Sequence, residues 1–211
     1  MKLLLTSIGI CNDTLDRELE SLVGKSKLDI KIGVVCTAGL VEGGSKDVFL
    51  DSMNNLRKYG YRWIDIMDIS NPNHDWKSRL SQCDVIYVSG GNTFFLMDQC
   101  RKVGFDQWLK DNIENHVYVG VSAGSITVGK SVEIATVEPA DDNFVGMADF
   151  TGMGLVPFNL SPHSPDMVSY ESNEEYQKKD GGVLYAYDEQ SAVKVEGDST
   201  EIVGGGKIFS L

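Results

Sequence analysis

The feature that most constrains the fold is the segment from His116 to Lys130, HVYVGVSAGSITVGK. Residues 117 to 121 form a short apolar run rich in β-branched and aromatic side chains, which is typical of a buried strand. The run ends abruptly at the small residues 122 to 125, which permit a sharp turn into a helix. We therefore expect a strand, a tight turn and a helix in immediate succession.

This turn carries the pattern G-x-S-x-G from Gly120 to Gly124, with Ser122 at its centre. The pattern is the signature of a nucleophile elbow, in which a strained strand-to-helix turn exposes a serine hydroxyl above a sheet. In a chain with 22 glycines, chance alone supplies it in roughly one sequence in five. Its place between a predicted strand and a predicted helix is the context that the motif requires; a plain turn of small residues is the alternative.

Strand-like and helix-like segments alternate along the first 130 residues. Apolar runs predict strands at residues 2–6, 31–36, 61–67, 84–88 and 117–121, and helical spacing predicts helices at about 14–23, 46–59, 94–103 and 108–113. Such alternation indicates a mostly parallel sheet with helices on both faces. We expect a three-layer α/β fold in one domain spanning residues 1–211, with a strand at 156–160 and further short strands after residue 182.

Unusual residues gather at one predicted edge of this sheet. Ligands bind beyond the carboxyl ends of the strands in open parallel sheets. Ser122, the turn at Gly90 and Gly91, and the predicted loop from Gly39 to Ser45 all follow strands at that edge. The sequence therefore places a candidate site there.

The overall charge excludes some partners. The chain has 19 basic and 31 acidic residues, a net charge of −12, and this disfavours binding to phosphate backbones or anionic membranes. We expect neither a nucleic acid nor a membrane as partner. A monomer or a homodimer is expected.

The four cysteines are widely spaced, without a C-x-x-C pair or a Cys/His cluster of metal-ligand spacing. We expect buried free thiols, no metal and no organic cofactor. The opening apolar run is too short for a signal peptide, and no stretch approaches the roughly 20 apolar residues of a spanning helix. A cytoplasmic location is the expectation.

A serine hydroxyl needs a base, and histidine is the usual one at neutral pH. His116 precedes the strand that leads to Ser122, about 16 Å away at the opposite edge of the sheet, so a structural role is expected. His74 is expected at a helix start or on the surface. His163 directly follows the predicted strand 156–160 between two prolines that restrain the backbone, which suits a rigidly presented base. A plain surface loop is the alternative there.

The base needs an orienting acid, and the oxyanion of acyl transfer needs hydrogen-bond donors. Spacing alone does not choose the acid. The candidates are Glu133, Glu138, Asp141 and Asp142, between Ser122 and His163, and Asp188 beyond them. The backbone N–H groups of Ala123 and Gly91 are the candidate oxyanion donors. The glycine turn is also compatible with a simple βα connection or with an anion site at a helix N-terminus.

Three motifs together resemble the aspartyl dipeptidase (peptidase E) family, to which cyanophycinases are related. They are GGNTF at 90–94, GVSAG at 120–124 and Pro162-His163, in matching order across about residues 1–165. The resemblance implies a serine exopeptidase on a flavodoxin-like fold akin to the class I glutamine amidotransferase domain. It implies Ser122 as nucleophile, His163 as base, and an acid between them. That order favours Glu138 over Asp188, with Asp141 in reserve.

One departure concerns the substrate. Peptidase E itself carries an arginine in a helical segment after the histidine, thought to help hold the N-terminal aspartate of the substrate. The corresponding residues 171–179 contain no arginine, and lysine is no equivalent for bidentate carboxylate recognition. We therefore expect a serine peptidase for dipeptides or short peptides without a strict preference for N-terminal aspartate. A serine esterase using the same residues and a non-catalytic protein that binds a small anion are the alternatives.

Overall fold

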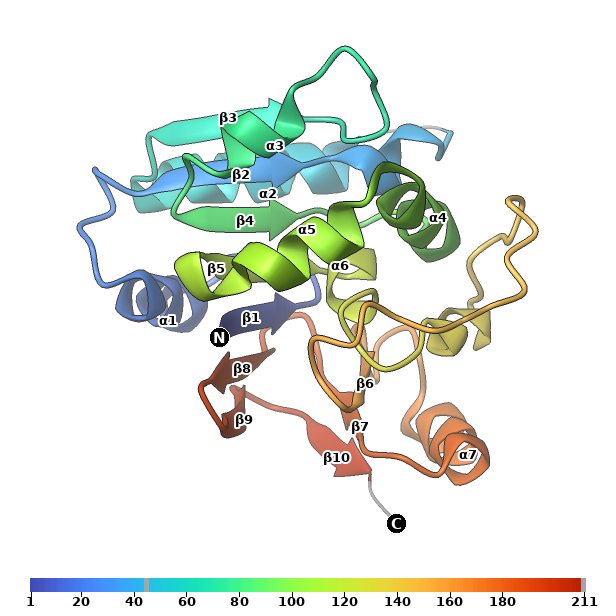
Figure 1. Cartoon of the computed structure of the whole chain (residues 1–211). Coiled ribbons are helices and arrows are strands. Elements are labelled where there is room, and N and C mark those ends of the chain that lie inside the picture. Colours follow the sequence, from blue (N-terminus) through green and yellow to red (C-terminus); the bar gives the residue numbers. More distant parts are fainter. Residues whose placement is uncertain (44–45, 210–211) are drawn as a thin grey trace.

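The computed structural model describes residues 1–43 and 46–209, so residues 44 and 45 of the predicted loop lie outside the described part. Its main feature is a seven-stranded sheet with the order β3-β2-β4-β5-β1-β8-β9 (Figure 1). The strands are β1 (Lys2–Thr6), β2 (Lys31–Val35), β3 (Trp63–Met67), β4 (Val85–Val88), β5 (Val117–Val121), β8 (Ala192–Glu196) and β9 (Ser199–Val203). β1 to β5 are mutually parallel, whereas β8 is antiparallel to β1 and β9 is antiparallel to β8.

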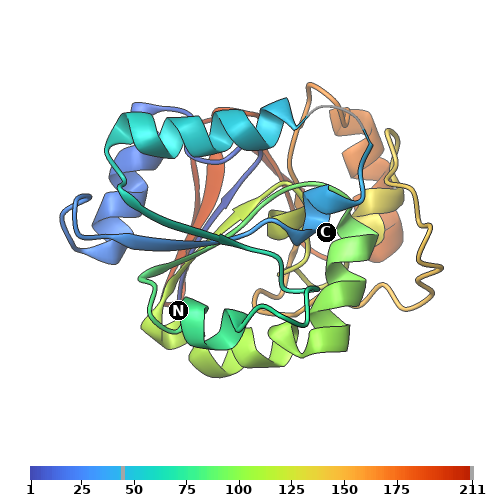
Figure 2. The same cartoon turned by 90° about the horizontal axis from the view of Figure 1, so that it is seen from above.

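Helices cover both faces of this sheet (Figure 2). One face carries α1 (Asp13–Val23) and α2 (Asp47–Tyr59), and the other carries α3 (Trp76–Leu80), α4 (Thr93–Val103) and α5 (Phe105–Asn112). Successive side chains of β1 point to opposite faces of the sheet, because side chains alternate along a strand. Leu4 packs with the first helical layer, while Leu3 and Leu5 pack with the second. The predicted three-layer α/β architecture is confirmed.

Three short strands and one helix form a smaller unit next to the carboxyl edge. A three-stranded sheet has the order β10-β7-β6, with β6 (Asn159–Ser161), β7 (Leu184–Ala186), β10 (Lys207–Phe209) and helix α7 (Tyr170–Asp180). β6 and β7 are parallel, with Ser161 opposite Ala186. This small sheet carries the histidine segment toward the elbow.

The predicted strands before residue 122 are confirmed with small shifts at their ends, but the strand predicted at 156–160 begins only at Asn159. The reason lies in the backbone bonds of the preceding residues. The N–H groups of Leu155 and Val156 donate to the carbonyl of Val128, 3.0 and 3.3 Å away, instead of to a neighbouring strand. Residues 155–158 therefore pack beside the connection that follows the elbow.

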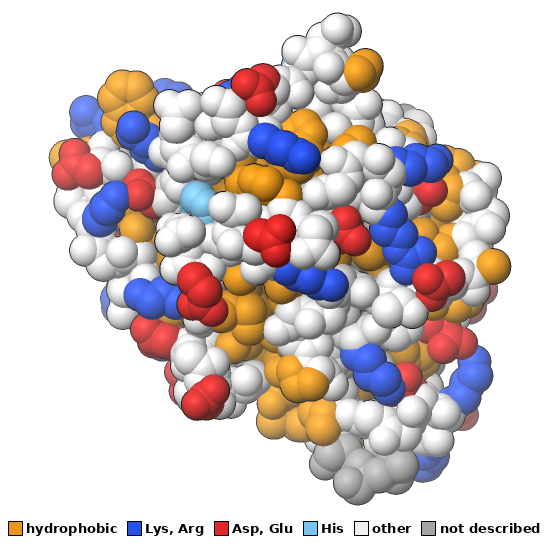
Figure 3. Space-filling view, in the orientation of Figure 1, with side chains coloured by type: hydrophobic (Ala, Val, Ile, Leu, Met, Phe, Trp, Pro, Cys, Tyr) orange, Lys and Arg blue, Asp and Glu red, His pale blue; other side chains and the backbone are white. Residues whose placement is uncertain are grey.

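Charge and apolar surface are mixed on the face shown in Figure 3, where blue and red side chains lie interspersed. None of the described helices is long and apolar enough to cross a membrane.

Gly124 offers a test of the packing at the elbow. A Cβ there would lie 2.2 Å from the carbonyl oxygen of Val88 on β4, so Gly124→Ala is expected to lower the free energy of unfolding by about 1–3 kcal/mol. Urea denaturation measures this. Gly43→Ala is the control, because a Cβ at Gly43 meets nothing within 4 Å. Equal midpoints for the two variants would contradict this packing.

Candidate active site

Ser122 lies between β5 and the short helix α6 (Ala123–Ile126), with φ 50° and ψ −113°. A positive φ is uncommon for a residue with a side chain and is held only where the surroundings enforce it. Two contacts do so here. The Ser122 N–H donates to the carbonyl of Thr6 at 2.9 Å, and the helix backbone approaches Gly120 so closely that a Cβ would lie 2.8 Å from the Gly124 oxygen. The glycines of the motif thus permit the turn that presents the hydroxyl.

His163 follows β6 and also has a positive φ, 62°. Its backbone N–H donates to Ser7 Oγ at 3.0 Å, and that hydroxyl donates to the carbonyl of Asp188 at 2.9 Å. The His163 carbonyl accepts the N–H of Met167 at 2.8 Å. These bonds fix the histidine loop to the end of β1 and to the segment after β7.

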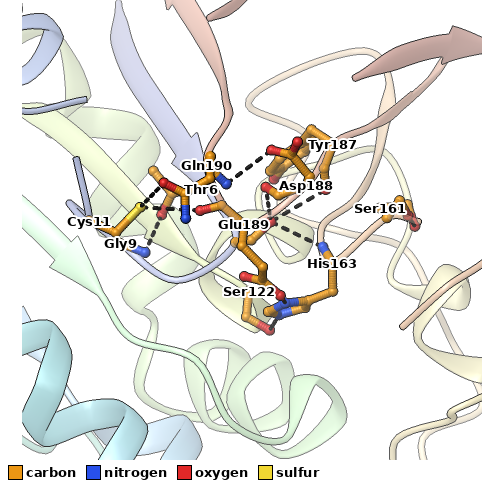
Figure 4. Close-up of polar contacts among 12 residues, drawn as sticks. Thr6, Gly9, Cys11, Ser122, Ser161, His163, Tyr187, Asp188, Glu189 and Gln190 are labelled. Atoms are coloured by element: carbon orange, nitrogen blue, oxygen red, sulfur yellow. Dashed lines mark hydrogen bonds and ion pairs between the residues drawn. The ribbon is translucent and has the colours of Figure 1, made fainter. Parts of the chain in front are cut away.

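The side chains of Ser122, His163 and Glu189 form a hydrogen-bonded series (Figure 4). His163 Nε2 lies 2.9 Å from Ser122 Oγ, and His163 Nδ1 lies 2.6 Å from Glu189 Oε1. An ionised carboxylate only accepts hydrogen bonds, so the proton belongs on Nδ1 and Nε2 is free to accept from the serine. The imidazole therefore has the tautomer that a general base requires.

The Glu189 side chain is partly buried beside His163. Its side chain is 26% exposed and that of His163 is 20% exposed, so water reaches both only in part. The second carboxylate oxygen, Oε2, is buried and has no hydrogen-bond partner among the described residues. A carboxylate with few other partners interacts strongly with a neighbouring positive charge. Among the described residues, the imidazole of His163 is therefore the one hydrogen-bond partner of the Glu189 carboxylate.

The acid predicted from the sequence was wrong in position. Glu138 is exposed and accepts the Ala140 N–H at 3.2 Å, away from His163. The other candidates also have different partners. Asp141 accepts the N–H of Thr93, the backbone carbonyl of Asp142 accepts the side-chain amide of Asn92, Asp188 accepts from Gln190 and Ser191, and Glu133 pairs with Lys179. Glu189 stands behind the imidazole instead.

Strand pairing explains why Glu189 is there. β6 and β7 are parallel and end level, with Ser161 opposite Ala186. His163 follows Ser161 by two residues and Glu189 follows Ala186 by three. Since neighbouring parallel strands end at one edge, the two side chains meet just beyond it. Glu189 could have been found by expecting β6 and β7 to be parallel neighbours, because the residues that follow them would then meet.

Gly91 lies on the other side of Ser122, after β4. It has φ 134°, and a Cβ there would lie 2.4 Å from the carbonyl atoms of Ala38, so only glycine fits. The N–H groups of Gly91 and Ala123 donate to no acceptor in residues 1–43 and 46–209. Gly91 lines the cavity, whereas Ala123 is fully buried at the start of α6.

The other histidines lie outside this arrangement, as predicted. His116 is largely buried, with Nδ1 2.8 Å from the carbonyl of Cys83, and His74 Nδ1 lies 3.2 Å from the carbonyl of Asp68. All four cysteines are free, but of the thiols expected to be buried only Cys100 is, and the other three are half-buried. Partial burial raises the pKa of the Cys83 thiol to about 11. In the described part of the chain, no group of three or more His, Cys, Asp or Glu residues is arranged to hold a metal ion.

A cavity of about 400 Å³ opens above Ser122 and His163, within the size range of small-molecule sites, about 300–1,000 Å³. The segments that line it follow β1, β2, β4 and β5, at the carboxyl edge of the large sheet to which the arrows of β1, β2 and β4 point in Figure 1, together with the segment that follows β6 of the small sheet. The fold and this geometry together define an α/β protein with a serine, a histidine and a glutamate in series at the carboxyl edge of its sheet.

Comparison with known proteins gives the family. The chain belongs to Peptidase family S51, whose family model matches residues 3–203. It is 30% identical over 117 residues to an uncharacterised peptidase of Pasteurella multocida, covering 54% of this chain and 56% of that protein. It is 30% identical over 122 residues to peptidase E of Shewanella amazonensis, covering 57% and 48%. The matched stretch thus spans about half the length of these relatives.

Two crystal structures have the same fold. One is a peptidase E candidate from Listeria monocytogenes EGD-e, with a TM-score of 0.78 and 22% identity over 96% of this chain and 97% of that one. The other is a peptidase from an acI-B1 actinobacterium, with a TM-score of 0.70 and 16% identity over 99% and 93%.

Proposed function

We propose that this chain is a serine peptidase that hydrolyses dipeptides or short peptides through an acyl-enzyme on Ser122. The observation that carries the proposal is the series from Ser122 through His163 to Glu189, with distances of 2.9 and 2.6 Å. Membership of Peptidase family S51 supports it. A protein that only binds a ligand needs no such series.

The reaction follows from the roles of these groups. Ser122 Oγ adds to the peptide carbonyl carbon while its proton passes to His163 Nε2, and Glu189 stabilises the resulting imidazolium. The backbone N–H groups of Gly91 and Ala123 stabilise the oxyanion. The C–N bond breaks as the imidazolium gives its proton to the leaving amine.

Deacylation repeats these steps with water. The water oxygen adds to the acyl carbon while His163 Nε2 takes a proton from that water. The bond to Ser122 Oγ then breaks, and the serine regains the proton. The chemistry uses one peptide and one water and needs no group beyond those named.

A peptide library tests the proposal. Wild-type protein and Ser122→Ala are incubated with dipeptides, longer peptides and activated esters, and the products are identified by mass spectrometry. Peptide cleavage by the wild-type protein alone is expected. Cleavage of esters without peptides would favour the esterase alternative. Equal activity of the two proteins would contradict the proposal, and so would the absence of any hydrolysis together with ligand-dependent thermal stabilisation.

A further inference from the structure

The cavity has one wall made of apolar side chains, which we call the apolar wall. Its residues come from two segments, one after α6 and one after His163. They are Ile134, Ala135, Val137, Pro139, Met167 and Val168. The wall is anchored to the reacting groups, because the N–H groups of Met167 and Val168 both donate to the carbonyl of His163, at 2.8 and 3.1 Å. It therefore has a fixed position relative to the base.

The first segment is also held at its far end. The Asp141 N–H donates to the carbonyl of Ala135 at 2.9 Å, and the Asp141 carboxylate accepts the Thr93 N–H at 2.7 Å. This links the apolar wall to the start of α4, next to Gly91. The wall thus extends from the histidine side of Ser122 to the side of the proposed oxyanion donors.

Besides the His163 imidazole, the described lining of the cavity has three ionisable side chains, Glu42, Asp141 and Lys46. Lys46 Nζ donates to the carbonyl of Gly39 at 2.6 Å and to that of Glu42. Partial burial raises the pKa of Glu42, the negative charge of Asp141 adds to this effect, and Lys46 offsets part of it. Because two acidic side chains and one lysine line the cavity, the charge of this lining is negative on balance.

An acidic substrate side chain would fit poorly here. Against the apolar wall its carboxylate would lose water without gaining donors, which is costly. The described lining holds no arginine for a bidentate pair, and its lysine donates to two backbone carbonyls, those of Gly39 and Glu42. An aliphatic side chain, by contrast, would bury only apolar surface against the wall, and removing apolar surface from water is favourable.

We propose that this cavity selects an uncharged aliphatic side chain on the residue that acylates Ser122, and that it discriminates against aspartate and glutamate there. The inference rests on the proposed peptidase function. The acyl residue is assigned to the wall because it stays bonded to Ser122 while the amine leaves and water enters. Its side chain is therefore the one that the cavity holds through both steps.

Two dipeptide series test this inference. In one the N-terminal residue varies before alanine, and in the other the C-terminal residue varies after alanine. We expect kcat/KM for leucyl-alanine to exceed that for aspartyl-alanine by at least about 100-fold, the scale on which a pocket rejects a misfitting group. A weaker dependence is expected in the second series.

Val137→Arg places a cation on the apolar wall. It is expected to shift the ratio of the two kcat/KM values toward aspartyl-alanine by about tenfold or more, through a charge-assisted pair. Thr136→Arg is the matched control, because Thr136 is exposed and outside the lining; its ratio should stay within about twofold of wild type. Met167→Arg, at an exposed position of the wall, repeats the test if Val137→Arg does not fold.

The possible outcomes are distinct. Preferred hydrolysis of aspartyl-alanine by wild-type protein would overturn the specificity and leave the peptidase function intact. An aliphatic preference confined to the second series would overturn the assignment to the acyl residue. Equal ratios for both arginine variants and the control would remove the wall from substrate recognition. Hydrolysis of no dipeptide in either series would overturn the specificity, and failure on the longer peptides as well would overturn the peptidase function.

Discussion

A Ser122→Ala variant is expected to lose about a million-fold in kcat on the best peptide substrate of the wild-type protein, the scale seen when a nucleophile of this type is removed. Ser122 supplies the atom that bonds to the acyl carbon, so no neighbouring group replaces it. The backbone contacts of the elbow, such as the N–H bond to Thr6 at 2.9 Å, do not involve the lost hydroxyl. The fold should therefore persist.

Stopped and continuous peptide assays on purified protein measure this loss, with circular dichroism as the control for folding. A folded alanine variant that keeps more than about a hundredth of wild-type activity would exclude Ser122 as the nucleophile, because the residual rate without it comes from binding and oxyanion donors alone.

Glu189→Gln is expected to lower kcat by about 10⁴-fold, as the loss of the negative charge beside a catalytic histidine does elsewhere. The amide cannot stabilise the imidazolium, and its NH₂ group can donate to Nδ1 and favour the wrong tautomer. Glu138→Gln is the matched control, since Glu138 is exposed and bonded to Ala140 N–H. Its kcat should stay within about twofold of wild type.

The pair of variants decides between the two glutamates. Steady-state kinetics over a range of pH gives kcat and the ionisations on which it depends. If kcat fell further in Glu138→Gln than in Glu189→Gln, the geometry around His163 would not be that of the working site.

Much of the fold follows from local sequence. The strands from β1 to β5 were predicted because each is a short apolar run bounded by loops or helices. Ser122 was predictable for a similar reason, since the turn after β5 is encoded in five adjacent residues. The position of His163 followed from its place between two prolines after an apolar segment.

Glu189 could not be found in this way, because its contact depends on pairing between segments far apart in sequence. His163 and Glu189 lie 26 residues apart and meet because β6 and β7 are parallel neighbours. The family resemblance directed attention to acids between the nucleophile and the base, and so to Glu138. The start of β6 could not be predicted for the same reason, because backbone hydrogen bonds from Leu155 and Val156 to Val128 decide where the strand begins.

We propose that Glu189 and His163 together activate the Ser122 hydroxyl. The most direct measurement is reaction with a fluorophosphonate, followed by mass spectrometry of the intact protein and its proteolytic fragments. We predict one adduct, on Ser122, formed far more slowly in His163→Ala and Glu189→Gln and at the wild-type rate in Glu138→Gln. Peptide hydrolysis by a protein whose Ser122 remains unlabelled, or labelling that is unaffected by the loss of His163, would contradict the account.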